Sequence, residues 1–244
     1  MRMIRVYIDA ALSPGTRITL PDVAANHLVR VLRLQPGADC VLFNGDGCDY
    51  SARLLSVGKR GVQAEILSSR VLENESPLRI TLLQGIARGE KMDLVLQKAT
   101  ELGVAAIVPV LAERTEVKLD AERMPKRIAH WRNVVISACE QCGRTRIPEV
   151  GAPAPLAEAV KMVANDTMRL TLDPFGTRTL AMLDAPVSGS IAIAIGPEGG
   201  WSPRDRDILR AAVFVGLRLG PRVLRTETAG LAAIAALQSR FGDL

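Results

Sequence analysis

The chain has 244 residues, of which 48% are hydrophobic but only 3% aromatic, and its formal net charge is +5. This length and apolar fraction exclude wholesale disorder and suit one large domain or two smaller ones with an aliphatic core. The scarcity of aromatic residues disfavours a protein that stacks many single-stranded bases. The surplus of cations suits a nucleic-acid partner, although an ordinary basic surface would look the same.

No stretch of the sequence approaches the roughly 20 apolar residues of a membrane span. The longest apolar runs are short, at residues 191–195 and 231–237, and residues 1–10 lack the extended apolar region of a secretory signal. Four cysteines without a disulfide-framework pattern fit a reducing compartment. We therefore expect a cytoplasmic protein that does not enter a membrane.

The first 70 residues predict short strands separated by tight turns. The turn sequences are SPG, QPG, NGDG and GKRG. The expected strands are 5–8, 17–20, 38–43, 50–57 and 61–67, with one helix at 24–32. This pattern indicates a small β-barrel. The polar segment LENESP at 72–77 resembles a linker, so the expected domains are 1–72 and 73–244.

The second half has a different pattern, in which continuous apolar strands alternate with helices. The expected strands are 78–86, 105–111, 168–172, 190–195 and 214–219, and the expected helices are 91–102, 121–142, 156–164, 203–212 and 227–241. Strands that are apolar on both faces predict an α/β fold, with a parallel sheet covered by helices on both sides.

Two glycine-containing loops follow strands of this predicted sheet. GPEGGWS at 196–202 follows the strand ending at 195, and LGPRVLRTET at 219–228 precedes the last helix; Asp173 ends a third strand. Either loop alone is equally compatible with a capped β–α turn, but two at successive strand ends favour a shared ligand pocket. Neither matches the dinucleotide or nucleoside-triphosphate fingerprints, which disfavours those ligands.

These residues resemble a known class of enzyme. GPEGGWSPRD and LGPRVLRTETA are similar to the knotted SPOUT class of RNA methyltransferases. LQKATELGV, AERT and ACEQCGRTRIPEV more closely resemble the ribosomal RNA small subunit methyltransferase E family, and residues 27–33 and 43–47 look like the PUA-like barrel of that family. The resemblance covers nearly the whole chain.

The resemblance implies properties that composition and spacing do not show. It implies a trefoil-knotted parallel sheet, whereas general topology rules alone would predict an unknotted one. It implies a homodimer that uses S-adenosyl-L-methionine to methylate N3 of one uridine in 16S rRNA. The partner would be 16S rRNA, within the 30S subunit, and not DNA.

By the same resemblance, the knot-forming loops should bind the cofactor, mostly through their backbone. The carried-over positions are Leu172, Gly196, Gly200, Leu219, Gly220, Leu224 and Ala229. Apolar walls with amides and carbonyls suit an adenine ring. Glu198 is left out, because a carboxylate at a helix start also has a purely electrostatic explanation.

For catalysis we expect Glu140 to accept or orient a proton and Arg225 or Arg144 to stabilise charge on the base. A helix would also bring Glu140 and Arg144 onto one face, where a surface ion pair is the alternative explanation. The expected RNA contacts are Arg114, Gln141, Arg30, Arg33, Lys59 and Arg60. For the last four, a solvated basic surface explains any single residue equally well.

Cys139 and Cys142 form a CxxC pattern. A zinc site needs a second ligand pair at suitable spacing, which Cys40 and Cys48 do not supply, so we expect packed, reduced thiols and no metal. The two histidines are expected to pack locally. Two other interpretations stay open: an RNA-binding assembly factor without catalysis, and a SPOUT enzyme acting on tRNA or on a ribose hydroxyl.

Overall fold

The computed structural model describes residues 4–58, 61–117, 120 and 122–244. The chain divides into two compact units. The first contains residues up to Glu75 together with Cys139–Ile147, and the second contains Ser76–Ala138 and Pro148–Leu244. None of the helices in the described ranges has the length and apolarity needed to cross a membrane.

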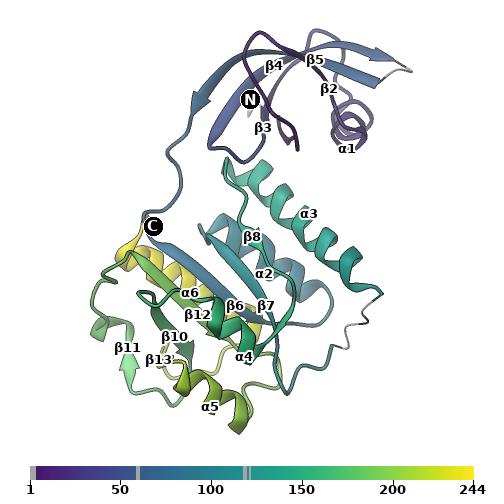
Figure 1. The fold of residues 1–244 in the computed structure, drawn as a ribbon. Coiled ribbons are helices and arrows are strands. Elements are labelled where there is room, and N and C mark those ends of the chain that lie inside the picture. Colours follow the sequence, from purple (N-terminus) through teal and green to yellow (C-terminus); the bar gives the residue numbers. More distant parts are fainter. Residues whose placement is uncertain (1–3, 59–60, 118–119, 121) are drawn as a thin grey trace. The chain divides into compact units, whose positions relative to one another are not determined.

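The first unit is a five-stranded sheet with the order β1-β3-β4-β5-β2 (Figure 1). Its strands are β1 (Arg5–Tyr7), β2 (Arg17–Thr19), β3 (Asp39–Phe43), β4 (Cys48–Gly58) and β5 (Gly61–Val71). β1 pairs parallel with β3, and the other pairs are antiparallel. Inward-facing aliphatic residues such as Leu42, Leu54 and Ile66 are buried in one core, which follows from the period-2 alternation of the strands.

The helix predicted at 24–32 forms, but it changes type along its length. α1 (Asp22–Asn26) continues as a π-helical turn, η1 (His27–Val31). Leu32 N then donates to His27 O at 3.0 Å, and Arg33 adopts a φ of 57°. A left-handed residue reverses the chain after a helix, so the segment ends with Arg33 turned outward and exposed.

The segment Cys139–Ile147 belongs to the first unit although residue 139 lies far beyond the predicted linker. The Arg5 guanidinium donates to Cys139 O at 2.9 Å and to Arg144 O at 3.2 Å, and it pairs with Asp49 at 2.7 Å. Asn74 Nδ2 donates to Gly143 O at 2.8 Å. The Arg5 contacts are partly buried and the Asn74 contact is exposed, and together they attach the segment to the rest of the first unit.

The second unit contains an entirely parallel sheet with the order β11-β13-β10-β12-β6-β7-β8, and β9 also pairs with β7. The strands are β6 (Arg79–Gly85), β7 (Ala106–Leu111), β8 (Glu149–Val150), β9 (Ala154–Pro155), β10 (Met168–Leu172), β11 (Arg178–Thr179), β12 (Ser190–Ile195) and β13 (Val215–Arg218). Residues 191–195 of the central β12 are all buried, as expected for a strand covered on both faces.

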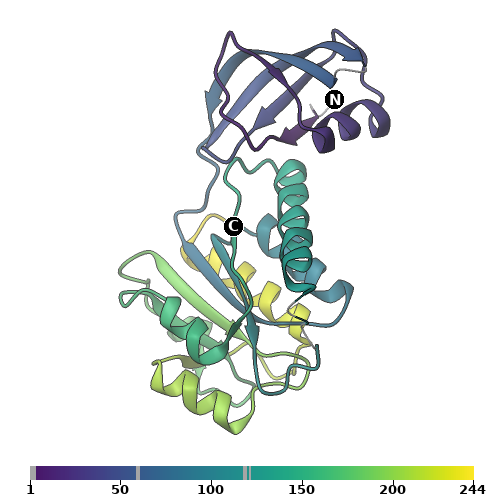
Figure 2. The same cartoon turned by 45° about the vertical axis from the view of Figure 1, so that its right-hand side comes forward.

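Helices cover both faces of this sheet (Figures 1 and 2). The long helices are α2 (Glu90–Glu101), α3 (Met124–Cys142), α5 (Pro203–Ala211) and α6 (Thr226–Phe241), and the short ones are α4 (Leu156–Ala159) and the 3₁₀ turns η2 (Val160–Met162) and η3 (Leu180–Met182). α6 packs on β6, β12 and α2. α4 and α5 share a core with Leu83, Ala192 and Ala194 on the opposite face.

The structure confirms the predicted α/β class with a parallel sheet and a small N-terminal β-domain. Every predicted helix and strand is present; β10 and β12 have the predicted ends and the others are shifted at one or both ends, while the π-helical turn η1 completes α1 and the 3₁₀ turn η2 completes α4. The prediction missed β8, β9, β11 and η3. These strands have two residues each, too short for any periodicity to show in the sequence.

Candidate functional site

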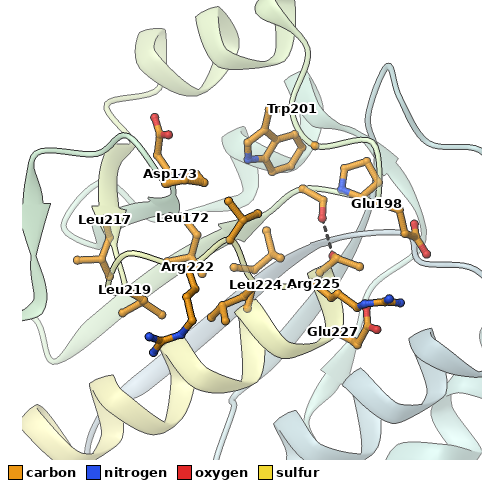
Figure 3. Close-up of a pocket in the computed structure, with 18 of the residues that line it drawn as sticks. Leu172, Asp173, Glu198, Trp201, Leu217, Leu219, Arg222, Leu224, Arg225 and Glu227 are labelled. Carbon is orange, nitrogen blue, oxygen red and sulfur yellow. Dashed lines mark hydrogen bonds between the residues drawn. The ribbon is translucent and has the colours of Figure 1, made fainter.

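A cavity of about 380 Å³ lies at the carboxyl ends of β10, β12 and β13 in the second unit (Figure 3). Parallel sheets bind ligands at this edge. All seven positions expected to contact a cofactor line this single cavity: Leu172, Gly196, Gly200, Leu219, Gly220, Leu224 and Ala229. The structure therefore brings together residues that are up to 57 positions apart in the chain.

The loop after β12 combines a tight turn with a helix cap. Gly200 N donates to Pro197 O at 2.8 Å, and Gly200 has a φ of 65° that favours glycine. Ser202 and Asp205 form a reciprocal capping box at the start of α5, with both bonds at 3.0 Å. The capping explanation of this loop is thus correct for Ser202, and it coexists with a cavity lined by the preceding glycines.

The second loop leads from β13 to α6 and is tied to the first. Gly220 turns the chain with a φ of 87°. The Thr226 hydroxyl donates to Gly196 O at 2.6 Å, which joins the start of α6 to the loop after β12. Leu219 and Leu224 supply apolar walls between them. The cavity is therefore formed mainly by backbone and aliphatic side chains.

One side of the cavity carries opposite charges. Lys91 Nζ lies 3.7 Å from carboxylate oxygens of both Glu198 and Glu227, and Glu198 Oε1 accepts the Arg88 amide at 3.0 Å. Burial opposes ionisation of Glu198, but backbone amides and the cations Lys91 and Arg88 outweigh it and hold its pKa below the usual range. Glu198 is thus held as a carboxylate at the cavity wall.

Arg225 also lines the cavity, where it is exposed and lies on the same side as Glu198 and Glu227 (Figure 3). Arg222 is on the opposite side, near Leu219. Arg114 reaches the same loop system, since its Nη1 donates to Gly199 O at 3.1 Å. Two of the predicted RNA-facing or catalytic arginines therefore belong to the cavity or its glycine loop.

Sequence reasoning missed several lining residues, among them Lys91, Trp201, Arg206, Arg222 and Glu227. Lys91 follows the carboxyl end of β6, so the strand-end argument applied to a fourth junction would have found it. Trp201 Nε1 donates to Thr171 Oγ1 at 3.0 Å, and Arg206 pairs with Asp173 at 3.3 Å. Those pairings join the end of β10 to the loop after β12 and to α5, so they leave no local signal in the sequence.

Glu140 lies in the first unit, where its Oε1 accepts the Tyr7 amide at 3.0 Å. Burial raises the pKa of this carboxyl, although the Tyr7 amide and the charges of His27 and Arg5 counteract it. Gln141 is exposed next to it. The main chain thus fixes one oxygen of Glu140.

The prediction that a helix places Arg144 beside Glu140 is wrong. α3 ends at Cys142, so Arg144 lies beyond the helix and the i, i+4 argument does not reach it. Its guanidinium is buried and forms a two-pronged ion pair with Glu75. Gly143, with a φ of 97°, causes this early helix end.

The basic residues expected to grip phosphates are only partly described. Arg30 and Arg33 are exposed at the end of η1 and just after it, whereas Lys59 and Arg60 lie outside the described residues. All four cysteines are free. Burial raises the pKa of the Cys139 thiol to about 12, which makes it a packed and unreactive thiol.

Comparison with known proteins defines the class of protein. Residues 74–238 match the model of the RNA methyltransferase domain, and residues 20–67 match that of the RNA methyltransferase PUA domain. The cavity and both of its loops fall inside the first match. The chain is therefore an RNA methyltransferase of two parts.

Relatives define the particular family. A ribosomal RNA small subunit methyltransferase E from Buchnera aphidicola is 35% identical over all of this chain and 98% of its own length. Two solved structures are 42% identical over the whole of both chains. One is a putative methyltransferase from Legionella pneumophila with bound SAM (TM-score 0.95). The other is a ribosomal RNA small subunit methyltransferase E from Neisseria gonorrhoeae bound to S-adenosyl methionine (TM-score 0.92). The chain belongs to the ribosomal RNA small subunit methyltransferase E family, which confirms the predicted SPOUT-type fold with a PUA-like domain.

Proposed function

We propose that this chain transfers the methyl group of S-adenosylmethionine to N3 of one uridine in 16S rRNA. One observation supports this most directly: a single cavity is lined by all seven residues expected to bind the cofactor, in a chain 42% identical to proteins solved with that cofactor bound. The 30S subunit is the proposed substrate particle, the homodimer the proposed working form, and the cytoplasm the proposed location.

The residues of the cavity fit this cofactor. An adenine ring needs apolar walls and a few backbone partners, which Leu172, Leu219 and Leu224 and the glycine loops supply. When bound, the cofactor supplies a sulfonium methyl carbon. In the transfer, a bond forms between uridine N3 and that carbon, the carbon–sulfur bond breaks, a neutral thioether leaves, and the N3 proton goes to an acceptor.

The residues of the chain have three proposed tasks in this reaction. Arg225 stabilises negative charge on the uracil oxygens as the N3 proton leaves, since a preorganised cation lowers the energy of developing charge. Glu140 accepts or orients that proton. Arg144, whose guanidinium is buried against Glu75, is better suited to hold the segment carrying Glu140 than to meet the base itself.

RNA binding is proposed for the remaining residues. Residues 1–72 would form the RNA-binding domain and 73–244 the catalytic domain. Arg30, Arg33, Lys59 and Arg60 would neutralise phosphates, and Arg114 and Gln141 would contact the RNA near the target base. The exposure of Arg30, Arg33, Arg114 and Gln141 is compatible with these roles.

A methyl-transfer assay tests the proposal. Purified protein is incubated with S-adenosylmethionine carrying a labelled methyl group and either 30S particles or free 16S rRNA, and the labelled nucleotide is mapped by nuclease digestion and mass spectrometry. We expect one labelled uridine that carries the methyl group at N3. Label on a ribose, or on tRNA offered in the same assay, would point to a different reaction. Cofactor binding without transfer to any RNA would support an assembly factor instead.

A further inference from the structure

Gln84 is a polar side chain in the middle of the apolar parallel sheet. It belongs to β6 and is completely buried. Its Nε2 donates to Gly85 O at 2.9 Å and to Thr226 Oγ1 at 3.1 Å. Burying an amide is costly unless it is hydrogen-bonded, so both partners of Nε2 are needed to keep it there.

These bonds continue to the cavity. Thr226 Oγ1 accepts from Gln84 and donates its single proton to Gly196 O at 2.6 Å. We call this chain of hydrogen bonds, from Gln84 through Thr226 to Gly196, the relay. Its direction is fixed, because the Gly85 carbonyl can only accept and therefore holds the NH₂ end of Gln84 in place. The rotor of the Thr226 hydroxyl is consequently locked onto Gly196.

The relay joins three segments that are distant in the sequence: the end of β6, the loop after β12 and the first residue of α6. Thr226 and Gly196 line the cavity, whereas Gln84 does not. The end of β6 also supports the loop directly. A Cβ placed on Gly85 would lie 2.5 Å from Pro197 N, so the strand and the loop are in close backbone contact.

Stability alone does not explain an amide at this position. Gln84 Oε1 is buried and has no hydrogen-bond partner within the described residues. An unsatisfied buried acceptor costs free energy that an apolar side chain of similar length would not. A methionine would fill the same space, so the amide is explained by what its Nε2 holds.

We propose that Gln84 is a positioning residue for the cofactor, which sets the affinity of the cavity through Thr226 and Gly196 without touching the ligand. This inference depends on the proposed function, in which the cavity binds S-adenosylmethionine. Without the Gln84 amide, the Thr226 hydroxyl regains rotational freedom and the carbonyl of Gly196 loses its fixed partner. The two loops then need to be ordered when the cofactor binds, and that cost lowers affinity.

The first test is Gln84→Met in the full-length protein, measured by calorimetric titration with S-adenosylmethionine and by thermal unfolding. We expect the dissociation constant to rise about tenfold, the loss that corresponds to one hydrogen bond at about 1.4 kcal/mol, while the melting temperature stays the same or rises. The matched control is Leu82→Met, a volume-conserving change on the same strand and face, outside the cavity lining. It should leave the dissociation constant unchanged.

The second test is a double-mutant cycle with Thr226→Val, which removes the hydroxyl, and Thr226→Ser, which keeps it. If the two residues act in one relay, Gln84→Met should add nothing to Thr226→Val but should still weaken Thr226→Ser. In the methylation assay, the KM for the cofactor should rise while kcat at saturation stays within twofold. If Gln84→Met does not fold, Gln84→Leu, which also lacks the amide, takes its place in the cycle.

The outcomes are distinguishable. Wild-type affinity in Gln84→Met, or additive losses in the cycle, would overturn the positioning role while the proposed function stands. An equal loss in Leu82→Met would show general disruption of the core and would also overturn it. If the wild-type protein itself does not bind the cofactor, the proposed function fails, and this inference fails with it.

Discussion

The two units of this protein present opposite kinds of surface at their candidate sites. The first unit carries exposed cations, Arg30 and Arg33, around a strongly turned helix end. The second encloses a cavity lined mainly by glycine backbone and aliphatic side chains. With the function proposed above, we expect two sources of affinity: charge, which salt screens, for RNA, and shape with desolvation for the cofactor. The four predictions below test this contrast in order of decreasing effect.

Arg225 departs from the contrast, since with Arg206 and Arg222 it is one of the exposed arginines that line the cavity of the second unit. Arg225→Gln should lower kcat by about 10²–10³, the usual cost of one preorganised donor at developing charge, and leave cofactor affinity within twofold. Steady-state methylation kinetics and calorimetry measure the two effects. Arg222→Gln, on the opposite side of the cavity (Figure 3), is the matched control and should lose less than tenfold. Equal losses would remove the specific role of Arg225.

Filling the cavity should separate the two functions. Ala229 is buried at the cavity wall on the first turn of α6. Ala229→Phe should weaken cofactor binding by about 10- to 100-fold, since overpacking costs about 1–3 kcal/mol, while RNA affinity is unchanged. Thr228→Phe, exposed on the same turn, should bind cofactor normally. A parallel loss of RNA affinity in Ala229→Phe would show that the two sites are not separable in this way.

Removing positive charge from the first unit should weaken RNA binding and leave cofactor binding unchanged. The combined change of Arg30, Arg33, Lys59 and Arg60 to Gln should weaken RNA binding and reduce its salt slope by up to about 3, at about 0.7 per phosphate contact. Cofactor affinity should stay the same. Arg30→Gln/Arg33→Gln is compared with Arg204→Gln/Arg210→Gln on α5, which removes the same charge from the second unit. If both double variants reduce the salt slope of RNA binding equally, RNA affinity depends on the net charge of the protein and not on this particular surface.

The smallest effect concerns one glutamate in each unit. Burial raises the pKa of Glu140, so the unfolded chain ionises first as pH rises, and wild type should lose stability relative to Glu140→Gln as the pH rises from the unfolded pKa through the folded one. This loss of stability should stay under about 1.5 kcal/mol, the usual contribution of one hydrogen bond.

The pKa of Glu198 is lowered, so the stability that its carboxylate contributes is present above its unfolded pKa and is lost as pH falls. Urea unfolding across pH should therefore give Glu140→Gln and Glu198→Gln opposite slopes, and slopes of the same sign would contradict this.

Local patterns were sufficient for much of the fold. Apolar runs such as residues 191–195 predicted buried parallel strands, and the structure contains them. The two glycine loops predicted a pocket because the strand-end rule needs only the order of strand, loop and helix. Glu227 and Lys91 were missed, since their proximity results from a contact between α2 and α6 that no local pattern records.

What the sequence determined by itself was therefore the type of each long element, the parallel sheet and the loops that line the cavity. The tertiary structure alone decided that residues 139–147 pack in the first unit, that Arg144 pairs with Glu75 and that Gln84 connects to Gly196 through Thr226. The physical reason is the distance along the chain over which each kind of interaction acts. Periodicity and turn chemistry act over a few residues, whereas buried polar groups take whichever partner the folded chain brings within hydrogen-bond distance.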